Sequence, residues 1–477
     1  MQRSFPIHSL LCRSVMAAAA IVFSLMTGLE TRADEIPSWD TAWTQSREIL
    51  VRETAGLDRA REPVEVEIQF RQPVRSGGVT GISDAVKREI RVVHCPRDRS
   101  PVEIPSQAFD IRPAAATRTG NDAEATPKDV FVRVRVAFFA DVAAYESERY
   151  VVWFDNPAAK APDYDSMLDV SGEGVGFTID NRDYHIVTEK TSGQIDQVDL
   201  AFATNLSLRF KYGTLHWNPD FIVVPDDFPV TGYTWYYAHH FDNPECATDS
   251  GPVFFSVRRK QLIPGQDVAY MEVSYRFYDS LPYFIMESYI EARKDTKTFA
   301  IRNDELAFGR TDFTHAGWRT KTPDMMDGHM GEIGSIAIYH ETRAGAHVLG
   351  SALPPNMAWI SLAHPANGFA VGSIRLEWEN VNALTGEPSP LYNSHTVISE
   401  HDEGLYWFRS LIYSPRSSAG VDTETVRSFL VDVPKGSSYR EKNAYLFYRC
   451  GAENTFSPID ELWMRLREPL QATVLTR

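Results

Sequence analysis

The chain is poor in cysteine, with four among 477 residues, and no two of them stand in a Cys-x-x-Cys pair. A zinc ribbon or a thioredoxin-type redox site, which both need such pairs, therefore has no support. The sequence also lacks a Gly-x-Ser-x-Gly elbow, a His-Glu-x-x-His pair, a phosphate-binding P-loop and a dinucleotide fingerprint. Serine-hydrolase, zincin, kinase and dehydrogenase chemistry are disfavoured for the same reason.

Basic residues are outnumbered, since 48 Lys and Arg face 64 Asp and Glu and give a formal net charge of −16. Such an acidic surface repels polyanions, so nucleic acid is not an expected partner. An acidic polysaccharide or oligosaccharide would need a locally positive cleft set against this field. Because the spacing of an EF-hand loop is also missing, no metal site and no cofactor is expected, although one Ca²⁺ held by loop carboxylates stays open.

Long apolar runs are missing except near the N-terminus. Arg3 and Arg13 precede an apolar run at residues 15–25, and Thr31-Arg32-Ala33 after it supplies a small-x-small cleavage site. The pattern predicts a secretory signal peptide over residues 1–33, with a periplasmic or extracellular mature protein. An uncleaved anchor is the alternative, although the run is shorter than the about 20 residues of a membrane-spanning helix. No later segment is expected to span a membrane.

Cysteine chemistry after cleavage is limited. Removal of the signal would take Cys12 away and leave Cys95, Cys246 and Cys450. An odd number of cysteines in an oxidising compartment allows at most one disulfide, whose pairing the sequence leaves open.

Aromatic residues and strand patterns are what the chain has in plenty. Phe, Tyr and Trp make up 12% of the residues, which is typical of β-rich proteins that offer rings to sugars or pack them on pleated faces. Residues 64–70 and 130–136 alternate apolar and polar side chains, as half-buried antiparallel strands do. Near-helical spacing predicts one short helix over residues 39–50, and Ser457-Pro458 predicts the start of a C-terminal helix.

A stretch rich in Pro and Ala at residues 156–162 is interpreted as a linker between two domains. We expect a small β-sandwich over residues 34–165 and a second domain over residues 166–477. Nearly continuous strand patterns from about Gly172 to Tyr448 require a large two-sheet sandwich, because a single open sheet of that length would curl or expose its edges. A propeller is the alternative, but the chain has no internal repeat. The expected fold class is therefore all-β: a small N-terminal β-sandwich and a large antiparallel supersandwich, with short terminal helices.

Several segments resemble proteins that act on carbohydrates. Residues 61–66, 102–107 and 130–138 follow an order similar to the N-terminal β-domain of exo-rhamnogalacturonan lyase-like proteins. Residues 176–184, followed by 192–195, resemble the first hairpin of the galactose-mutarotase-like supersandwich that many polysaccharide lyases share. The resemblance implies a mutarotase-like supersandwich and the cleavage of a uronate-containing glycan. The chain departs from many such lyases in having no room for a helical toroid that supplies catalytic residues.

Cleavage of a uronate linkage by β-elimination requires a group that neutralises the carboxylate, a base that removes the C5 proton, and an acid for the leaving oxygen. One aromatic and histidine-rich segment offers Trp235 as a stacking residue, Tyr237 as the acid and His240 as the base. If this segment is a strand throughout, His240 points to one face, and Tyr237 and His239 point to the other. An aromatic core strand with histidines at the sheet edge is the alternative.

A second cluster combines Asn303, His315, Trp318 and Arg319. Trp318 is a candidate for stacking on a sugar, and Arg319 for binding a uronate carboxylate through the two parallel bonds that its planar guanidinium allows. His315 is an alternative base, and Asn303 would help to neutralise the carboxylate. The alternative interpretation is a surface turn with ordinary ion pairs.

A third cluster contains Tyr392, His395 and Arg409. These side chains would serve as acid, base and carboxylate clamp if the fold brought them together. The site would then hold all three groups that β-elimination requires.

The sequence therefore favours a secreted polysaccharide lyase, and two alternatives stay open. A non-catalytic carbohydrate-binding protein would keep aromatic platforms without a converging His, Tyr and Arg set. A mutarotase-type epimerase would use a His and a Glu on monosaccharides and form no double bond. The three interpretations differ in whether His240, His315 and His395 approach one cleft that contains an arginine.

Overall fold

The computed structural model describes residues 39–73, 78–114, 129–203, 207–209, 219–227, 232–263, 267–309, 312–319, 325–329, 358–389, 396–401, 404–413, 427 and 430–475. The signal peptide expected over residues 1–33 lies outside the described residues. Within the described part of the chain, no helix is long and apolar enough to cross a membrane.

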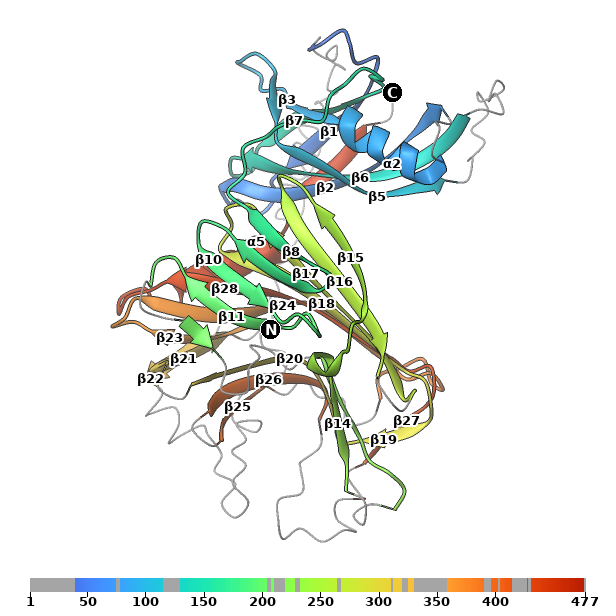
Figure 1. The fold of residues 1–477 in the computed structure, drawn as a ribbon. Coiled ribbons are helices and arrows are strands. Elements are labelled where there is room, and N and C mark those ends of the chain that lie inside the picture. The colour runs from blue at the N-terminus through green and yellow to red at the C-terminus, as the bar shows by residue number, and fades with distance from the viewer. Residues whose placement is uncertain are drawn as a thin grey trace, which may run out of the picture.

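The N-terminal part consists of two antiparallel sheets and one helix, α2 (Gly78–Glu89). In Figure 1 it is drawn mainly in blue and cyan, and one strand from the C-terminus is drawn in red. The five-stranded sheet has the order β29 (Gln471–Leu475), β1 (Gln45–Arg52), β7 (Ser147–Phe154), β3 (Arg91–His94) and β4 (Val102–Ile104). The three-stranded sheet has the order β2 (Arg59–Pro73), β6 (Asp129–Val142) and β5 (Ser106–Ala114). Apolar residues of β2 and β6 stand opposite each other, as in the pairs Val66↔Val136 and Ile68↔Val134, and fill the core between the sheets.

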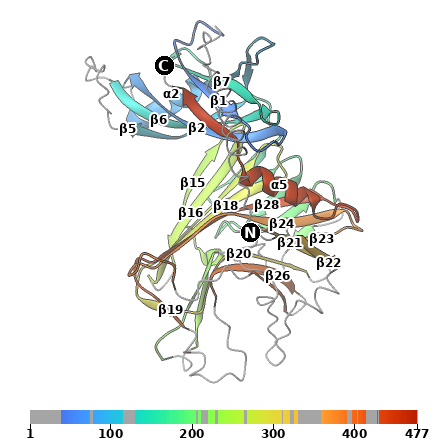
Figure 2. The same ribbon diagram turned by 180° about the vertical axis from the view of Figure 1, so that it is seen from behind.

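The larger part is organised around one nine-stranded antiparallel sheet that is visible from both sides in Figures 1 and 2. Its order is β15 (Glu245–Ser250), β16 (Phe254–Leu262), β17 (Ala269–Tyr278), β18 (Tyr283–Ala292), β28 (Ser438–Arg449), β24 (Phe369–Val381), β23 (Trp359–His364), β21 (His315–Arg319) and β22 (Met325–His329). A two-stranded ribbon joins β19 (Thr296–Thr298) to β27 (Val431–Val433).

Two five-stranded sheets pack on one face of the nine-stranded sheet. The β10 sheet has the order β12 (Ser207–Arg209), β11 (Ile195–Leu200), β10 (Tyr184–Thr188), β9 (Gly176–Asp180) and β8 (Asp169–Glu173). The β20 sheet has the order β14 (Thr234–Tyr237), β13 (Asp220–Val223), β20 (Ala300–Gly309), β26 (Gly404–Tyr413) and β25 (Thr396–His401). One continuous apolar core joins the inner faces of all three sheets. The expected fold class, an all-β protein with a large antiparallel supersandwich, is confirmed.

The opposite face of the nine-stranded sheet packs against α5 (Ser457–Arg467) and the three-stranded sheet. The C-terminal helix begins at Ser457 with Pro in its first turn, as expected, and buries Ile459 and Trp463. The expected helix over residues 39–50 is wrong. Residues 45–52 form β1, because pairing with β7 and β29 on both sides buries Ile49 and Val51 in strand alternation. The near-helical spacing reflects a contact between Trp39 and Trp43 ahead of the strand, with ring centroids 5.1 Å apart.

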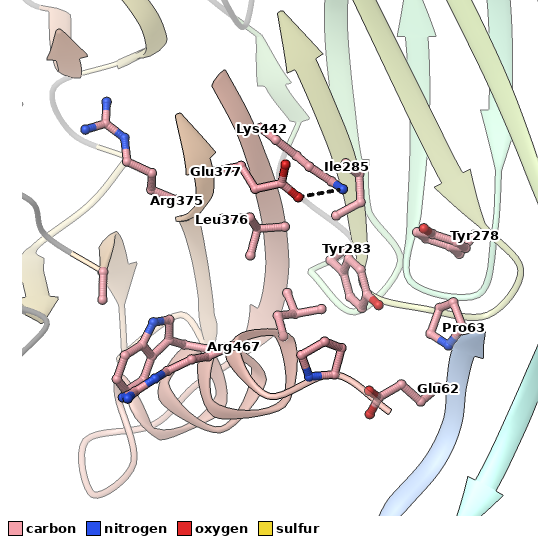
Figure 3. Close-up of a pocket in the computed structure, with 14 residues that line it drawn as sticks. Glu62, Pro63, Tyr278, Tyr283, Ile285, Arg375, Leu376, Glu377, Lys442 and Arg467 are labelled. Carbon is pink, nitrogen blue, oxygen red and sulfur yellow. Dashed lines mark hydrogen bonds and ion pairs between the residues drawn. The ribbon is translucent and has the colours of Figure 1, made fainter. Parts of the chain in front are cut away.

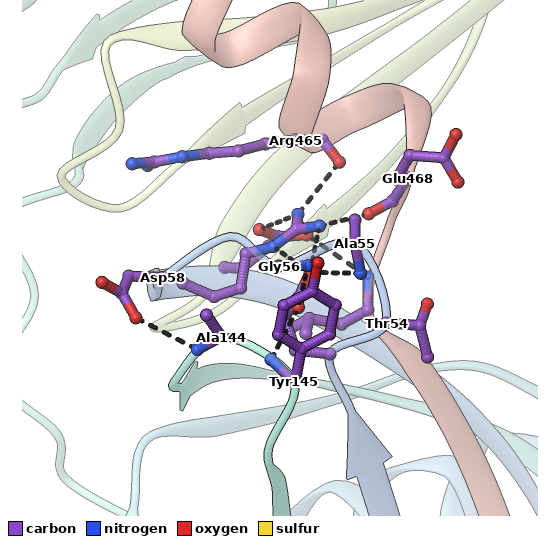
Figure 4. Close-up of polar contacts among 12 residues, drawn as sticks. Thr54, Ala55, Gly56, Asp58, Ala144, Tyr145, Arg465 and Glu468 are labelled. Carbon is purple, nitrogen blue, oxygen red and sulfur yellow. Dashed lines mark hydrogen bonds and ion pairs between the residues drawn. The ribbon is translucent and has the colours of Figure 1, made fainter. Parts of the chain in front are cut away.

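The C-terminal segment returns to the N-terminal part and fastens the two parts together. After α5 the chain forms β29, which pairs with β1. Arg59 is 3% exposed, and its guanidinium forms ion pairs with Glu53 at 3.0 Å and Glu62 at 2.8 Å. The same guanidinium donates hydrogen bonds to the carbonyl oxygens of Arg465 and Glu468, at the end of α5. Figure 4 shows Arg465 and Glu468 facing the Thr54–Gly56 turn.

The three cysteines that follow the expected signal peptide are all free thiols. Cys95 and Cys450 are buried, and Cys246 is partly exposed. Burial raises the pKa of the Cys95 and Cys450 thiols to about 11. Both thiols are therefore protonated and unreactive near neutral pH.

Candidate functional site

The described structure joins the first sequence cluster into a ladder of rings along β14. Trp235 and Tyr237 share a face of this strand, and their rings stack with centroids 5.7 Å apart and an interplanar angle of 3°. The Tyr237 ring stacks in turn on His239, at 4.8 Å and 25°. His240 lies edge-on to Tyr237 at 5.2 Å and to His239 at 4.2 Å. We call Trp235, Tyr237, His239 and His240 the ring ladder.

A 3₁₀ turn places both histidines next to Tyr237. The strand ends at Tyr237, and η1 (Ala238–His240) follows, closed by a hydrogen bond from the Phe241 N–H to the Ala238 carbonyl. The expectation that His239 and His240 point to opposite faces of a strand is therefore wrong. Burial of Ala238 and Phe241 in the core turns the chain here, because both side chains face inward. The turn, and not strand alternation, brings the His240 ring next to Tyr237.

The electrostatic environment of the ladder keeps its imidazoles neutral. Burial, helped by the nearby charges of His240 and Arg259, lowers the pKa of His239 to about 4. Burial also lowers the pKa of His240. The buried Nδ1 atom of His239 has no hydrogen-bond partner among the described residues. Neutral imidazoles can accept a proton, so the ladder has the protonation state that a general base needs.

A fixed cation lies against the other end of the ladder. The guanidinium carbon of Arg302 lies 4.5 Å from the Trp235 ring centroid, at cation–π distance. Arg302 also pairs with Glu305 at 3.1 Å, and both side chains are almost fully buried. Strand register explains the contact, since Asp220 of β13 pairs with Tyr237 on one side and with Arg302 on the other.

Two register shifts in β20 send the next residues into the interior. The pairing of β20 with β26 shifts between Ile301 and Arg302 and again between Arg302 and Asp304. Asn303 is fully buried, and its Nδ2 donates to Ser288 Oγ at 2.8 Å. Its Oδ1 has no partner among the described residues.

Asp304 and Arg409 form a buried ion pair at 2.5 Å behind the ladder. The Asp304 carboxylate also accepts hydrogen bonds from Tyr445 at 2.8 Å and from Ser373 at 2.9 Å. A second buried ion pair lies beside it, in which Arg375 Nε is 2.8 Å from Glu441 Oε1. Asn303 and Arg409 thus lie between the two sheets, with no surface open to a ligand in this conformation.

The remaining members of the second cluster lie elsewhere and do not share one face. Trp318 is 3% exposed and packs in the core between the sheets. Arg319 lies on the opposite face of β21, where it pairs with Asp460 and covers the Trp463 ring at 4.6 Å. His315 shares the face of Arg319 by strand alternation. Its Nδ1 lies 3.0 Å from the hydroxyl oxygen of its neighbour Thr314.

His315 and the ring ladder lie at opposite ends of the nine-stranded sheet. The ladder adjoins β16, because the Asp242 N–H donates to the Gln261 side chain at 2.9 Å. Six strand spacings separate β16 from β21 in the sheet, a distance of roughly 29 Å. His240 and His315 therefore cannot serve the same sugar. Tyr392 and His395 lie outside the described residues.

A hollow of about 550 Å³, which the sequence analysis missed, lies between the N-terminal part, α5 and the nine-stranded sheet (Figure 3). Tyr283 and Trp463 line it, and Lys442 pairs with Glu377 across its wall at 3.2 Å. Its lining residues range from Glu62 to Pro469, so no local pattern could have indicated it. No group of three or more His, Cys, Asp or Glu side chains within the described residues is placed to hold a metal ion.

Comparisons with known proteins find similarity at the level of the fold and not of the sequence. No known family model matches the chain, and no curated protein matches its sequence. An α-mannosidase from Enterococcus faecalis is similar over 97% of this chain and 49% of that chain, with a TM-score of 0.55 and 10% identity. A protein in glycosyl hydrolase family 38, also from Enterococcus faecalis, is similar over 92% of this chain and 48% of that chain, with a TM-score of 0.52 and 12% identity.

The chain therefore spans about half the length of these two solved proteins. A galactose mutarotase-like protein from Lactobacillus casei gives a TM-score of 0.33 at 11% identity, over 57% of this chain and 100% of that chain. At 10% and 12% identity, the two Enterococcus faecalis proteins show a similarity of fold alone. The resemblance to exo-rhamnogalacturonan lyase-like proteins has no matching family model.

Proposed function

We propose that the protein binds a glycan through the ring ladder and acts on it as a polysaccharide lyase. The observation that carries the proposal is the continuous stack of Trp235, Tyr237 and His239, with Arg302 fixed at its end. Aromatic faces suit the apolar faces of sugar rings, and a neighbouring cation suits a uronate carboxylate. The fold similarity to an α-mannosidase and to a protein in glycosyl hydrolase family 38 supports a carbohydrate ligand.

The proposed reaction is β-elimination at a uronate. His240, a neutral imidazole, takes the C5 proton, the C4–O bond breaks, and a C4=C5 double bond forms. Tyr237 gives its hydroxyl proton to the departing oxygen. The imidazolium of His240 then returns the C5 proton through solvent to the tyrosinate, whose ring centroid lies 5.2 Å away, and both groups regain their starting protonation. Of Arg302, Arg319 and Asn303, Arg302 is the residue that contacts the ladder, so it takes the neutralising role. It acts through its positive field, because the guanidinium is almost fully buried and paired with Glu305.

A paired set of variants tests binding and chemistry separately. Trp235→Ala removes a stacking face, and we expect roughly fivefold weaker glycan binding. Tyr237→Phe keeps the ring and removes the acid, so binding should persist while elimination falls by about 10²-fold or more. Binding is measured by calorimetry on a panel of pectic, alginate and glycosaminoglycan oligomers, and elimination by the ultraviolet absorbance of the unsaturated product.

Tyr145→Phe is the matched control, because it removes the hydroxyl of a tyrosine that is 75% exposed in the N-terminal part. Binding without any double bond would leave a carbohydrate-binding protein. Conversion of a monosaccharide anomer or epimer without absorbance would indicate an epimerase. Unchanged binding in Trp235→Ala would refute the ladder as the glycan site.

A further inference from the structure

A second hollow, of about 610 Å³, lies on the outer edge of the nine-stranded sheet and carries an excess of positive charge. Four of its lining residues are basic: Lys260, Arg293, Lys294 and Lys435. Two are acidic: Glu245 and Asp267. The whole protein has a formal net charge of −16, so this hollow runs against the overall field. We call it the basic hollow.

We infer that the basic hollow is an anion-binding subsite for an acidic glycan that extends from the ring ladder. The inference rests on the proposed function, and it names the substrate class: a glycan with carboxylate or sulfate groups spaced along its chain. It would supply the locally positive surface that an acidic polysaccharide needs on this acidic protein.

The charges of the hollow are only partly neutralised within the protein. Lys260 pairs with Glu245 at 2.9 Å, and Arg293 pairs with Glu291 at 3.1 Å. Lys435 is exposed, and its ammonium forms no ion pair with any described residue. The Asp295 carboxylate lies close by and accepts from the Lys435 backbone N–H at 2.8 Å. An exposed ammonium that forms no ion pair can still attract an anionic ligand.

Aromatic and guanidinium groups give the hollow a shape suited to a sugar acid. The Arg293 guanidinium carbon lies 5.3 Å from the Tyr270 ring centroid, at cation–π distance, and both residues line the hollow. A planar guanidinium can donate two parallel hydrogen bonds to a carboxylate or a sulfate. The volume falls within the range of small-molecule sites, and Gln261 supplies a polar amide to the lining.

Continuity with the ladder comes from Gln261. Its Oε1 accepts from the Asp242 N–H at 2.9 Å, and its Nε2 donates to the Asp242 carbonyl at 3.0 Å. Asp242 follows His240 by two residues, which span at most about 7 Å. One glycan chain can therefore contact the histidine end of the ladder and the basic hollow together.

The test compares an oligogalacturonate with its carboxyl-reduced counterpart of equal length, on the full chain, by calorimetry. Lys435→Ala should weaken oligogalacturonate binding roughly threefold, and Lys435→Glu more strongly, with no change for the neutral oligomer. Arg99→Ala is the control, because it removes one positive charge whose side chain is 77% exposed in the N-terminal part. Raising the salt concentration should reduce the difference between the two oligomers.

The outcomes separate this inference from the proposed function. Equal binding of both oligomers, or no effect of Lys435→Glu, overturns the basic hollow and leaves the ladder standing. If Lys435→Glu loses binding and Trp235→Ala binds as tightly as the wild type, the basic hollow is supported and the ladder is overturned as the glycan site. A sulfated galactan that binds more tightly than oligogalacturonate, and loses that advantage in Lys435→Glu, identifies sulfate as the anion. If no oligomer binds, both proposals fall.

Discussion

Removal of the Asp304 carboxylate should destabilise the larger part of the protein more than most single substitutions. Asp304 is fully buried and accepts from Arg409, Tyr445, Ser373 and Trp407, at distances from 2.5 to 3.3 Å. Asp304→Ala leaves the Arg409 guanidinium buried without its ion-pair partner. Removal of one partner of a buried pair destabilises a protein by about 3–5 kcal/mol, and we expect that range here.

A double-mutant cycle measures the pair itself. Asp304→Leu combined with Arg409→Met removes both charges, and such apolar replacements are often neutral or stabilising. We therefore expect the double variant to regain most of the stability that either single variant loses, giving a coupling energy of about 2 kcal/mol or more. Urea denaturation followed by tryptophan fluorescence supplies the free energies of unfolding. Additive losses in the double variant would refute the reasoning, because they would mean that the two charges do not depend on each other.

Two further predictions concern pH and the C-terminal fastening. The folded protein lowers the pKa of His239 from 6.5 to about 4, so as the pH falls the unfolded chain binds a proton at this residue before the folded chain does. The contribution of the neutral ring to the free energy of unfolding is therefore complete above pH 6.5 and is lost as the pH falls toward 4. His239→Gln should remove this pH dependence, which amounts to about 3 kcal/mol in the free energy of unfolding. Thermal unfolding is measured from pH 7 to 4, and an equal pH dependence of the melting temperature in the wild type and the variant would contradict the prediction. Arg59→Met leaves Glu53 and Glu62 without their shared cation, so the melting temperature should drop by several degrees and proteolysis between α5 and β29 should rise. Unchanged proteolysis would show that β29 stays attached without Arg59.

Local patterns predicted the fold where alternation continues over many residues. The strands β2 and β6 follow from the alternation over residues 64–70 and 130–136, although their pairing with each other does not. The C-terminal helix follows from its Ser-Pro start. The helix expected over residues 39–50 failed, because a strand paired on both sides overrides a weak helical spacing. Helix α2 was missed, although Ile82, Val86 and Ile90 carry the i, i+4, i+8 spacing of a buried helix face.

The candidate site was predictable in part, because sequence proximity brought Trp235, Tyr237 and His240 together. The role expected of Arg319 required a contact that only the sheet order decides, and α5 covers that face. Arg302 directly precedes Asn303 of the second cluster, but its place at the ladder depends on the register of β13 with β20. Register between strands far apart in sequence leaves no local signal.

The polar segment Arg302–Glu305 raises the question of why a strand in a sandwich core keeps four consecutive polar residues. Buried charges give little stability that apolar residues of the same volume would not give. Their arrangement is explained if the two register shifts must hold Arg302 against Trp235 while Asp304 anchors the strand to Arg409 from behind. The stable Asp304→Leu, Arg409→Met variant should then bind glycan at least roughly fivefold more weakly than the wild type, because Arg302 is no longer held at the ladder. Wild-type affinity in that stable variant would show that the buried pair serves folding alone, because the anchor would then be absent without any loss of glycan binding.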